Sequence, residues 1–135
     1  MSNPGPASVQ TIHPTNLATD QAIRLLAYYK QVNLGATGDT VLPIFNTSQY
    51  SVSNVILTNA STSISTAAAG VFPAPSATGT AIVASATLTV ATGAVVQETV
   101  ASTALQTTQN LYFNVATAQA GYVDVYVYGY DFPQF

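Results

Sequence analysis

The sequence predicts an all-β fold, organised as one β-sandwich or jelly-roll-like domain of about eight short strands with an extended N-terminal arm. Runs rich in β-branched and aromatic residues recur every ten to fifteen residues or so, and Gly, Pro, Asn and Ser separate them. A chain of 135 residues is also long enough to bury a real core within one domain. A small closed barrel is the alternative that these patterns leave open.

The first part of the chain has a different composition from the rest. Pro4, Pro6 and Pro14 interrupt it, which forbids a regular helix and predicts an extended arm that is either disordered or laid on a neighbouring molecule. From Asp20 to Lys30 the apolar residues fit both helical and alternating spacing, so a short helix and a strand are both open. The predicted organisation is an arm with this ambiguous element over residues 1–28, the β-sandwich domain over 29–131 and a C-terminal tail over 132–135.

The expected strands, in chain order, are 30–34, 40–45, 50–59, 66–72, 81–90, 95–100, 110–116 and 122–130. The first two are expected to form a hairpin, because residues 35–39 are rich in turn formers. In the fifth, alternation is expected to place Ala84, Ala86, Leu88 and Val90 on one side of the strand. The Ala-, Ser- and Thr-rich middle of the chain is predicted to be ordered, since turn signals and β-branched residues run through it.

The run from Tyr122 to Tyr130 is the clearest strand. Its alternation puts Val123, Val125 and Val127 on one side, which we expect to face the core. The residues on the other side that we take as a candidate interface are Tyr122, Tyr126, Tyr128 and Tyr130. Asp124 shares that side, which predicts that it is not deeply buried within one subunit. A solvent-facing or loop-covered strand is the alternative interpretation.

Charge is scarce in this protein. Charged residues make up 5% of the chain, against about 25% in an ordinary soluble domain. The net charge is -3, and the two basic residues are Arg24 and Lys30. Neighbouring copies can therefore pack closely with little electrostatic penalty, which favours assembly. Two basic residues cannot neutralise a phosphate backbone, so no nucleic-acid partner is expected.

The sequence contains no cysteine, which excludes disulfides and thiolate chemistry and is compatible with a reducing cytoplasm. The first ten residues lack the basic start and apolar run of a secretory signal. No uninterrupted apolar run is long enough for a transmembrane helix, so no membrane partner is expected.

The sequence contains no motif typical of catalysis or of metal or cofactor binding. His13 is the only histidine and lies in the predicted arm, far in sequence from any acidic residue except Asp20. Residues 35–38 lack the ending of a phosphate-binding loop and are interpreted as a turn. The carboxylates that could serve as oxygen ligands of a metal ion do not have the spacing of a calcium-binding loop. They are Asp39, Glu98, Asp124 and Asp131. We therefore expect no catalytic residues, no metal and no cofactor.

Four segments, Ser53–Phe72, Gly79–Ala84, Leu111–Gln119 and Asp124–Gly129, resemble a family of small proteins encoded among the head genes of tailed bacteriophages. The resemblance covers roughly residues 30–131. It implies a non-enzymatic capsid decoration, or cement, protein, made in the host cytoplasm and located in the virion on the outer capsid surface. The implied partners are the major capsid protein and further copies of this chain, with a homotrimer expected because an icosahedral shell has local three-fold positions.

Two other functions remain open at this stage. One is a carbohydrate- or receptor-binding β module of a phage tail or fibre, in which exposed tyrosine rings stack on sugars. The other is an enzyme whose activity depends on His13, for which the sequence offers no oriented base.

Overall fold

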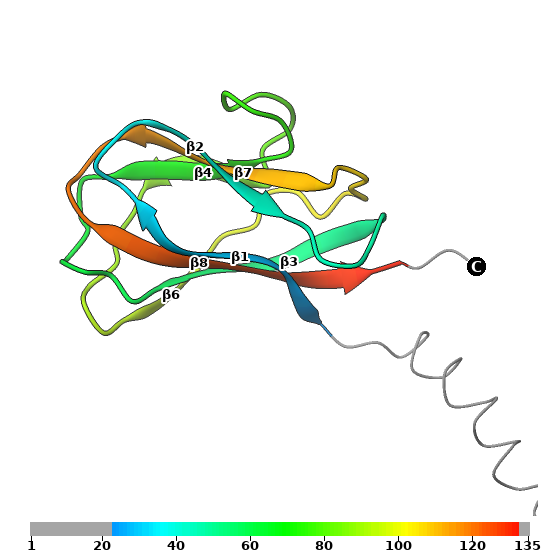
Figure 1. The fold of residues 1–135 in the computed structure, drawn as a ribbon, viewed down its shortest axis with the longest axis horizontal. Coiled ribbons are helices and arrows are strands. Elements are labelled where there is room, and N and C mark those ends of the chain that lie inside the picture. Colours follow the sequence, from blue (N-terminus) through cyan, green and yellow to red (C-terminus); the bar gives the residue numbers. More distant parts are fainter. Residues whose placement is uncertain (1–22, 133–135) are drawn as a thin grey trace, which may run out of the picture.

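Two four-stranded antiparallel sheets lie face to face in the computed structural model, which describes residues 23–132 (Figure 1). The strands are β1 (Arg24–Asn33), β2 (Gly38–Pro43), β3 (Tyr50–Thr58), β4 (Ala68–Phe72), β5 (Val83–Thr87), β6 (Val95–Glu98), β7 (Asn110–Thr117) and β8 (Tyr122–Asp131). Residues 23–132 contain no helix, so the predicted all-β class is confirmed. Within the same residues there is consequently no helix that could span a membrane.

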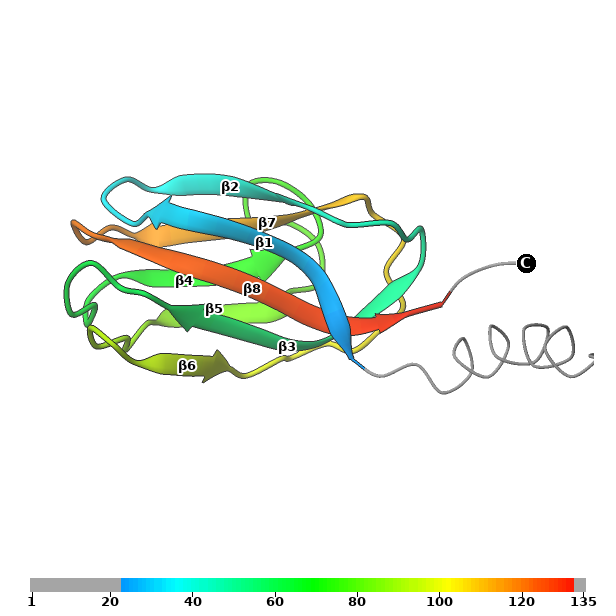
Figure 2. The same cartoon turned by 60° about the horizontal axis from the view of Figure 1, so that its bottom comes forward.

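The strand order is β1-β8-β3-β6 in one sheet, called sheet A here, and β2-β7-β4-β5 in the other, sheet B (Figure 2). Each strand of the first half pairs with its counterpart from the end of the chain: β1 with β8, β2 with β7, β3 with β6 and β4 with β5. This is a long antiparallel ribbon rolled into two sheets, the winding of a jelly roll. The predicted sandwich is therefore observed in place of a closed barrel.

The core lies between the sheets and is built from the inward side of every long strand. Val123, Val125 and Val127 of β8 are fully buried, which confirms the valine side predicted from alternation. Gly129 continues this side, and a Cβ there would overlap the backbone oxygen of Ser51 on β3. The close approach of β3 to β8 therefore requires glycine at this position.

The hairpin predicted between the first two strands is wrong. β1 belongs to sheet A and β2 to sheet B, so residues 34–37 cross from one sheet to the other. Leu34 is fully buried, and its N–H donates to Gly121 O at 2.9 Å while its carbonyl accepts from Gln119 N at 2.8 Å. The chain leaving β1 thus binds the β7–β8 connection, and turn-forming residues alone do not specify that flanking strands pair.

The first strand begins at Arg24, earlier than the predicted residue 30, so the helical alternative is wrong from this residue onward. Residues 24–28 belong to the sandwich, and the predicted domain boundary at residue 29 is too late. Register shifts after Leu25 and after Tyr29 interrupt the alternation of β1, which leaves Leu26 and Ala27 both buried. The predictions for the arm and for His13 lie outside the described residues, as does the predicted tail beyond Phe132.

The alternation predicted for residues 81–90 holds only in part. Leu88 and Val90 are buried, but Ala84 and Ala86 are exposed. β5 is a short strand at the edge of sheet B, with a register shift in its pairing to β4, so few neighbours cover it. The alternation of alanine with serine and threonine in this edge strand therefore did not predict which side chains are buried.

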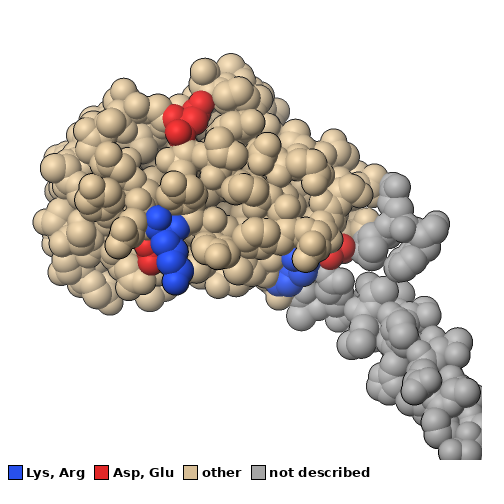
Figure 3. Space-filling view, viewed as in Figure 1, with Lys and Arg blue, Asp and Glu red and all other residues tan. Residues whose placement is uncertain are grey.

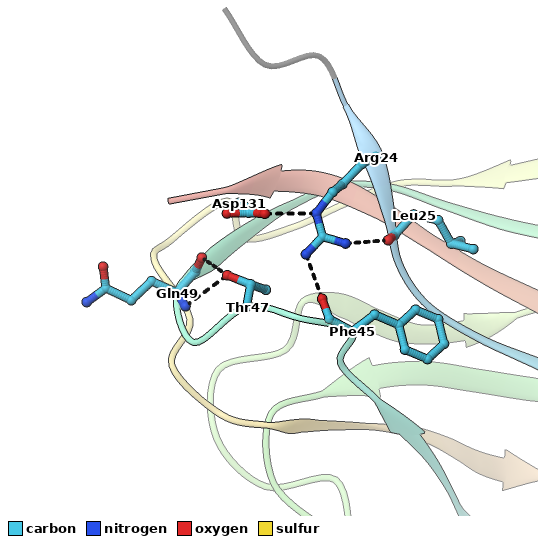
Figure 4. A network of polar contacts seen from close by, with 6 residues as sticks. All are labelled: Arg24, Leu25, Phe45, Thr47, Gln49 and Asp131. Atoms are coloured by element: carbon cyan, nitrogen blue, oxygen red, sulfur yellow. Dashed lines mark hydrogen bonds and ion pairs between the residues drawn. The ribbon is translucent and has the colours of Figure 1, made fainter. Parts of the chain in front are cut away.

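The start of β1 and the end of β8 are joined by an ion pair (Figure 4). Arg24 Nε donates to Asp131 Oδ2 at 3.0 Å, and the same guanidinium donates to the carbonyl oxygens of Leu25 at 3.0 Å and Phe45 at 2.6 Å. Phe45 N in turn donates to Leu26 O at 2.8 Å. One side chain thus joins the start of β1 to the end of β8 and also holds Phe45, two residues after β2, against β1.

Candidate contact surface

The four predicted interface tyrosines lie on the outer side of sheet A, in the central strand β8. Tyr122 and Tyr130 are 47% and 41% exposed, while Tyr126 and Tyr128 are half-buried. The structure therefore brings all four onto one accessible surface of a four-stranded sheet. Neighbouring strands flank the two half-buried rings, which gives them fixed positions.

Tyr28 of β1 extends this surface and was missed by the sequence analysis. It lies opposite Tyr126 in the β1–β8 register, and the two rings stack with centroids 6.1 Å apart and planes 22° apart. Ile56 of β3 lies on the other side of Tyr126. We call the set Tyr28, Tyr122, Tyr126, Tyr128 and Tyr130 the tyrosine face.

Asp124 lies on the same side of β8. The sequence predicted that this carboxylate is not deeply buried, but it is only 6% exposed, so that prediction is wrong. Its carboxylate accepts hydrogen bonds from Gln31 N at 2.8 Å and Asn59 Nδ2 at 2.9 Å. Both donor residues have positive φ, 58° at Gln31 and 54° at Asn59. Asp124 therefore stabilises an irregular point in β1 and the end of β3, and the tyrosine rings themselves make up the exposed part of the surface.

The remaining carboxylates are far from forming a cluster. Asp131 pairs with Arg24, and Asp39 lies at the start of β2 in the other sheet. Glu98 lies on edge strand β6, where burial raises the pKa of its carboxyl above the ordinary value. Among residues 23–132, no three His, Asp or Glu side chains come close enough to hold a metal ion together. In Figure 3 most of the displayed face is uncharged, and charged side chains stand in a few separate places, in some of which a basic and an acidic side chain are neighbours.

The loop after β4 lies on the outer side of sheet B. Phe72 points away from the core at the β4–β7 pairing with Tyr112, but it is only 7% exposed. The loop after β4 is tied to this side of the sheet by Asp39, whose carboxylate accepts from Ser76 N and from Asn114 Nδ2, both at 2.7 Å. The same loop rises above β4 and β7 in Figure 1.

A shallow apolar groove of about 590 Å³ runs along the edge where β1 and β2 meet. The residues that line it are Tyr28, Tyr29, Lys30, Val41, Pro43 and Phe45. Tyr29 lies opposite the buried Val125 and so belongs to the core side of β1, yet it is 44% exposed. Because β1 is an edge strand, its core side opens into the seam between the two sheets. This set is called the β1–β2 groove.

The groove was not predicted because two signals in the sequence were ambiguous. The adjacent aromatic residues Tyr28 and Tyr29 stand in the segment that fitted both helix and strand. Val41, Pro43 and Phe45 alternate, which could have indicated an outward apolar row, but the assumed hairpin gave no reason to place it beside the tyrosines.

Comparison with protein-family models, with curated proteins and with solved structures found no match.

Proposed function

We propose that this protein is a non-enzymatic capsid decoration, or cement, protein that binds the outside of an assembled phage head and stabilises it by protein–protein contacts. The observation that carries the proposal is the tyrosine face, an accessible row of aromatic rings on the outer side of a sheet, in a chain with few charged residues. Tyrosine is enriched in protein interfaces because its ring buries apolar area while its hydroxyl keeps a hydrogen-bond partner.

The resemblance to proteins encoded among phage head genes supports the same function, as does the jelly-roll winding, which is shared by viral capsid domains and by lectins. The fold alone does not determine function, so the surface carries more weight. In the proposed mechanism the tyrosine face is buried across joints between copies of the major capsid protein. Binding to the assembled shell and not to its free subunits then opposes dissociation by mass action.

A homotrimer is the proposed form on the head, since local three-fold positions of the shell can each accept one trimer with equivalent contacts. The low charge of the chain, with a net charge of -3, removes most of the repulsion that would keep copies apart. Light scattering of the purified chain measures its molar mass, and a monomer at all accessible concentrations would contradict a preformed trimer.

The test of the proposal is co-sedimentation of the purified chain with heads assembled without it. We expect saturable binding at a fixed ratio to the capsid protein, and heads that resist heating better once decorated. A cryo-EM map of the decorated heads would then show the site and its symmetry. Absence of binding to such heads, together with absence of the chain from virions, would overturn the proposal.

The second candidate function is a carbohydrate- or receptor-binding module of a tail or fibre. The exposed rings of Tyr122 and Tyr130 favour it, because phenol rings stack on sugars. A glycan array separates the two functions. Specific glycan binding that is lost in Tyr122→Ser and Tyr130→Ser would favour the module, whereas a cement protein should show no glycan specificity.

A further inference from the structure

Contacts within the domain hold two of the aromatic residues that line the β1–β2 groove. Phe45 is held on β1 through both its N–H and its carbonyl, by Leu26 O and by the Arg24 guanidinium. The ring of Tyr28 lies between Phe45, at a centroid distance of 5.4 Å, and Tyr126, at 6.1 Å. Rings that are already ordered lose little entropy when a ligand packs on them, so the groove is suited to binding.

The chemistry of the groove points to a proline-rich peptide. Its lining contains three aromatic rings, a valine and a proline, and its side-chain polar groups are two phenol hydroxyls and the Lys30 ammonium. Proline-rich segments bind aromatic-lined grooves through ring packing, and their backbone carbonyls have no internal partners and can accept from such donors. A sugar ligand would need a denser set of polar groups to replace its hydration.

The chain itself contains a segment of this kind. Residues 3–7 read Asn-Pro-Gly-Pro-Ala, with two prolines that restrict the backbone before binding. Residues 8–22 join them to Ile23, and this connection of 15 residues can span at most about 50 Å. The groove at Tyr29 lies six residues along β1 from Ile23, a distance of about 20 Å at the rise of a strand.

A random-coil chain of 15 residues has a root-mean-square length of about 21 Å, which matches that span. Effective concentration is greatest when the two lengths match and reaches the millimolar range. A weak site is then occupied by its own segment before a second copy competes at micromolar concentration.

We propose that residues 3–7 of the N-terminal segment bind in the β1–β2 groove of their own chain. Pro4 and Pro6 pack on Tyr28, Tyr29 and Phe45, and Lys30 donates to a segment carbonyl. The aromatic groove is covered in the free protein. This proposal is independent of the function proposed above, because it requires neither a capsid nor an oligomer.

The test uses the full chain and the fact that it contains no cysteine, so that a Ser2→Cys variant takes a single spin label. Paramagnetic broadening of backbone amides is measured by NMR on the labelled, isotope-enriched chain. We expect strong broadening at Tyr29, Lys30 and Val41 that does not change on dilution with unlabelled protein. A matched sample mixes spin-labelled chain without isotope with isotope-enriched chain without label, and we expect no broadening there.

Two pairs of variants identify the contacts. The double variant Pro4→Ser with Pro6→Ser should lose the broadening, while Pro14→Ser should keep it. Tyr29→Ser should lose it, while Tyr122→Ser, an equally exposed tyrosine outside the groove, should keep it. The proposal is overturned by unbroadened groove amides, by equal broadening in the mixed sample, which would mean a second copy as the occupant, or by broadening that survives the double proline variant.

Discussion

The outer sides of the two sheets differ in what covers them. Sheet B presents Phe72 outward, yet Phe72 is only 7% exposed, and Asp39 ties the loop after β4 to the same side of the sheet through Ser76. Sheet A presents the tyrosine face, where Tyr122 and Tyr130 remain more than two-fifths exposed. Both sheets thus carry aromatic residues on the side away from the core, but Phe72 of sheet B is buried whereas the rings of the tyrosine face remain accessible.

The difference teaches that an outward aromatic residue is not in itself a contact surface. Phe72 has no polar atom in its side chain and is covered, whereas each ring of the tyrosine face ends in a hydroxyl that water or a partner can satisfy. Substitutions on the covered side should therefore change stability, and substitutions on the uncovered side should change association.

The largest effect is expected on the inner side of β8, immediately behind the tyrosine face. Gly129→Ala places a Cβ onto the Ser51 carbonyl and 2.8 Å from Leu26 Cδ1, so the strands must separate. We expect a loss of about 3 kcal/mol in the free energy of unfolding, measured by urea titration. Gly35→Ala is the control, since its Cβ would lie 3.0 Å from the side chain of Asn33 and 3.7 Å from Ala120 Cα, an ordinary contact distance for backbone. Equal stability of the two variants would contradict the close packing of β3 on β8.

The two structural aspartates provide the next comparison, one in each sheet. Asp124→Ala leaves two part-buried donors, Gln31 N and Asn59 Nδ2, without their charged acceptor, and we expect a loss of about 2 kcal/mol. Asp39→Ala frees an exposed loop, with an expected loss of about 1 kcal/mol and faster hydrogen exchange at Ser76. Urea titration and amide exchange measure both. Slow exchange at Ser76 in Asp39→Ala would mean that other contacts hold the loop in place.

The tyrosine face is tested by replacing Tyr126 and Tyr128 together with Ser. We expect association between copies, or binding to heads, to weaken by about tenfold or more, because half-buried rings at the centre of an interface contribute most of its energy. Tyr112→Ser, a half-buried tyrosine on the outer side of sheet B, is the matched control and should leave association unchanged. Light scattering, head binding and melting temperature are measured for each. Lowered stability with unchanged assembly would assign the rings to the fold.

The smallest effect concerns Glu98, which pairs with Val55 and therefore points toward the core side at the β6 edge. Burial raises the pKa of its carboxyl in the folded chain above the ordinary 4.5, so the folded state holds the proton more tightly than the unfolded state does. The stability of the natural chain should fall as pH rises from 4.5 through the raised pKa. Glu98→Gln removes this dependence, so it should be slightly more stable than the natural chain at pH 7 and equally stable at pH 3, in urea titrations at both. An identical difference at the two pH values would contradict this assignment.

The sequence predicted the parts of the molecule where one regular period governs the chain. Strict alternation in β8 identified both the buried valines and the accessible tyrosines, and turn residues placed most strand ends within a few positions. It failed where tertiary pairing decided the outcome. The bulges of β1 hid its start and the role of Tyr28 and Tyr29, and the turn-rich residues 35–39 gave no indication that the chain changes sheets there.

Asp124 shows why the sequence placed the tyrosine side chains on one side of β8 but wrongly predicted that the aspartate beside them is exposed. A carboxylate on an outward side of a strand predicts exposure, unless backbone donors elsewhere in the chain reach it. Here those donors come from Gln31 and Asn59, which are distant in sequence and adopt positive φ. No local pattern in the sequence could indicate that pairing.

The Arg24–Asp131 ion pair has a mechanical consequence. β1 and β8 are antiparallel neighbours, so tension applied through the start of β1 and the end of β8 opens their ladder like a zipper, one hydrogen-bonded pair at a time, beginning at this ion pair. Tension that enters across the outer side of sheet A is instead shared by many bonds at once. The domain therefore resists load spread over its sheet far better than load applied at its ends, and single-molecule pulling from these two points should record a low unfolding force.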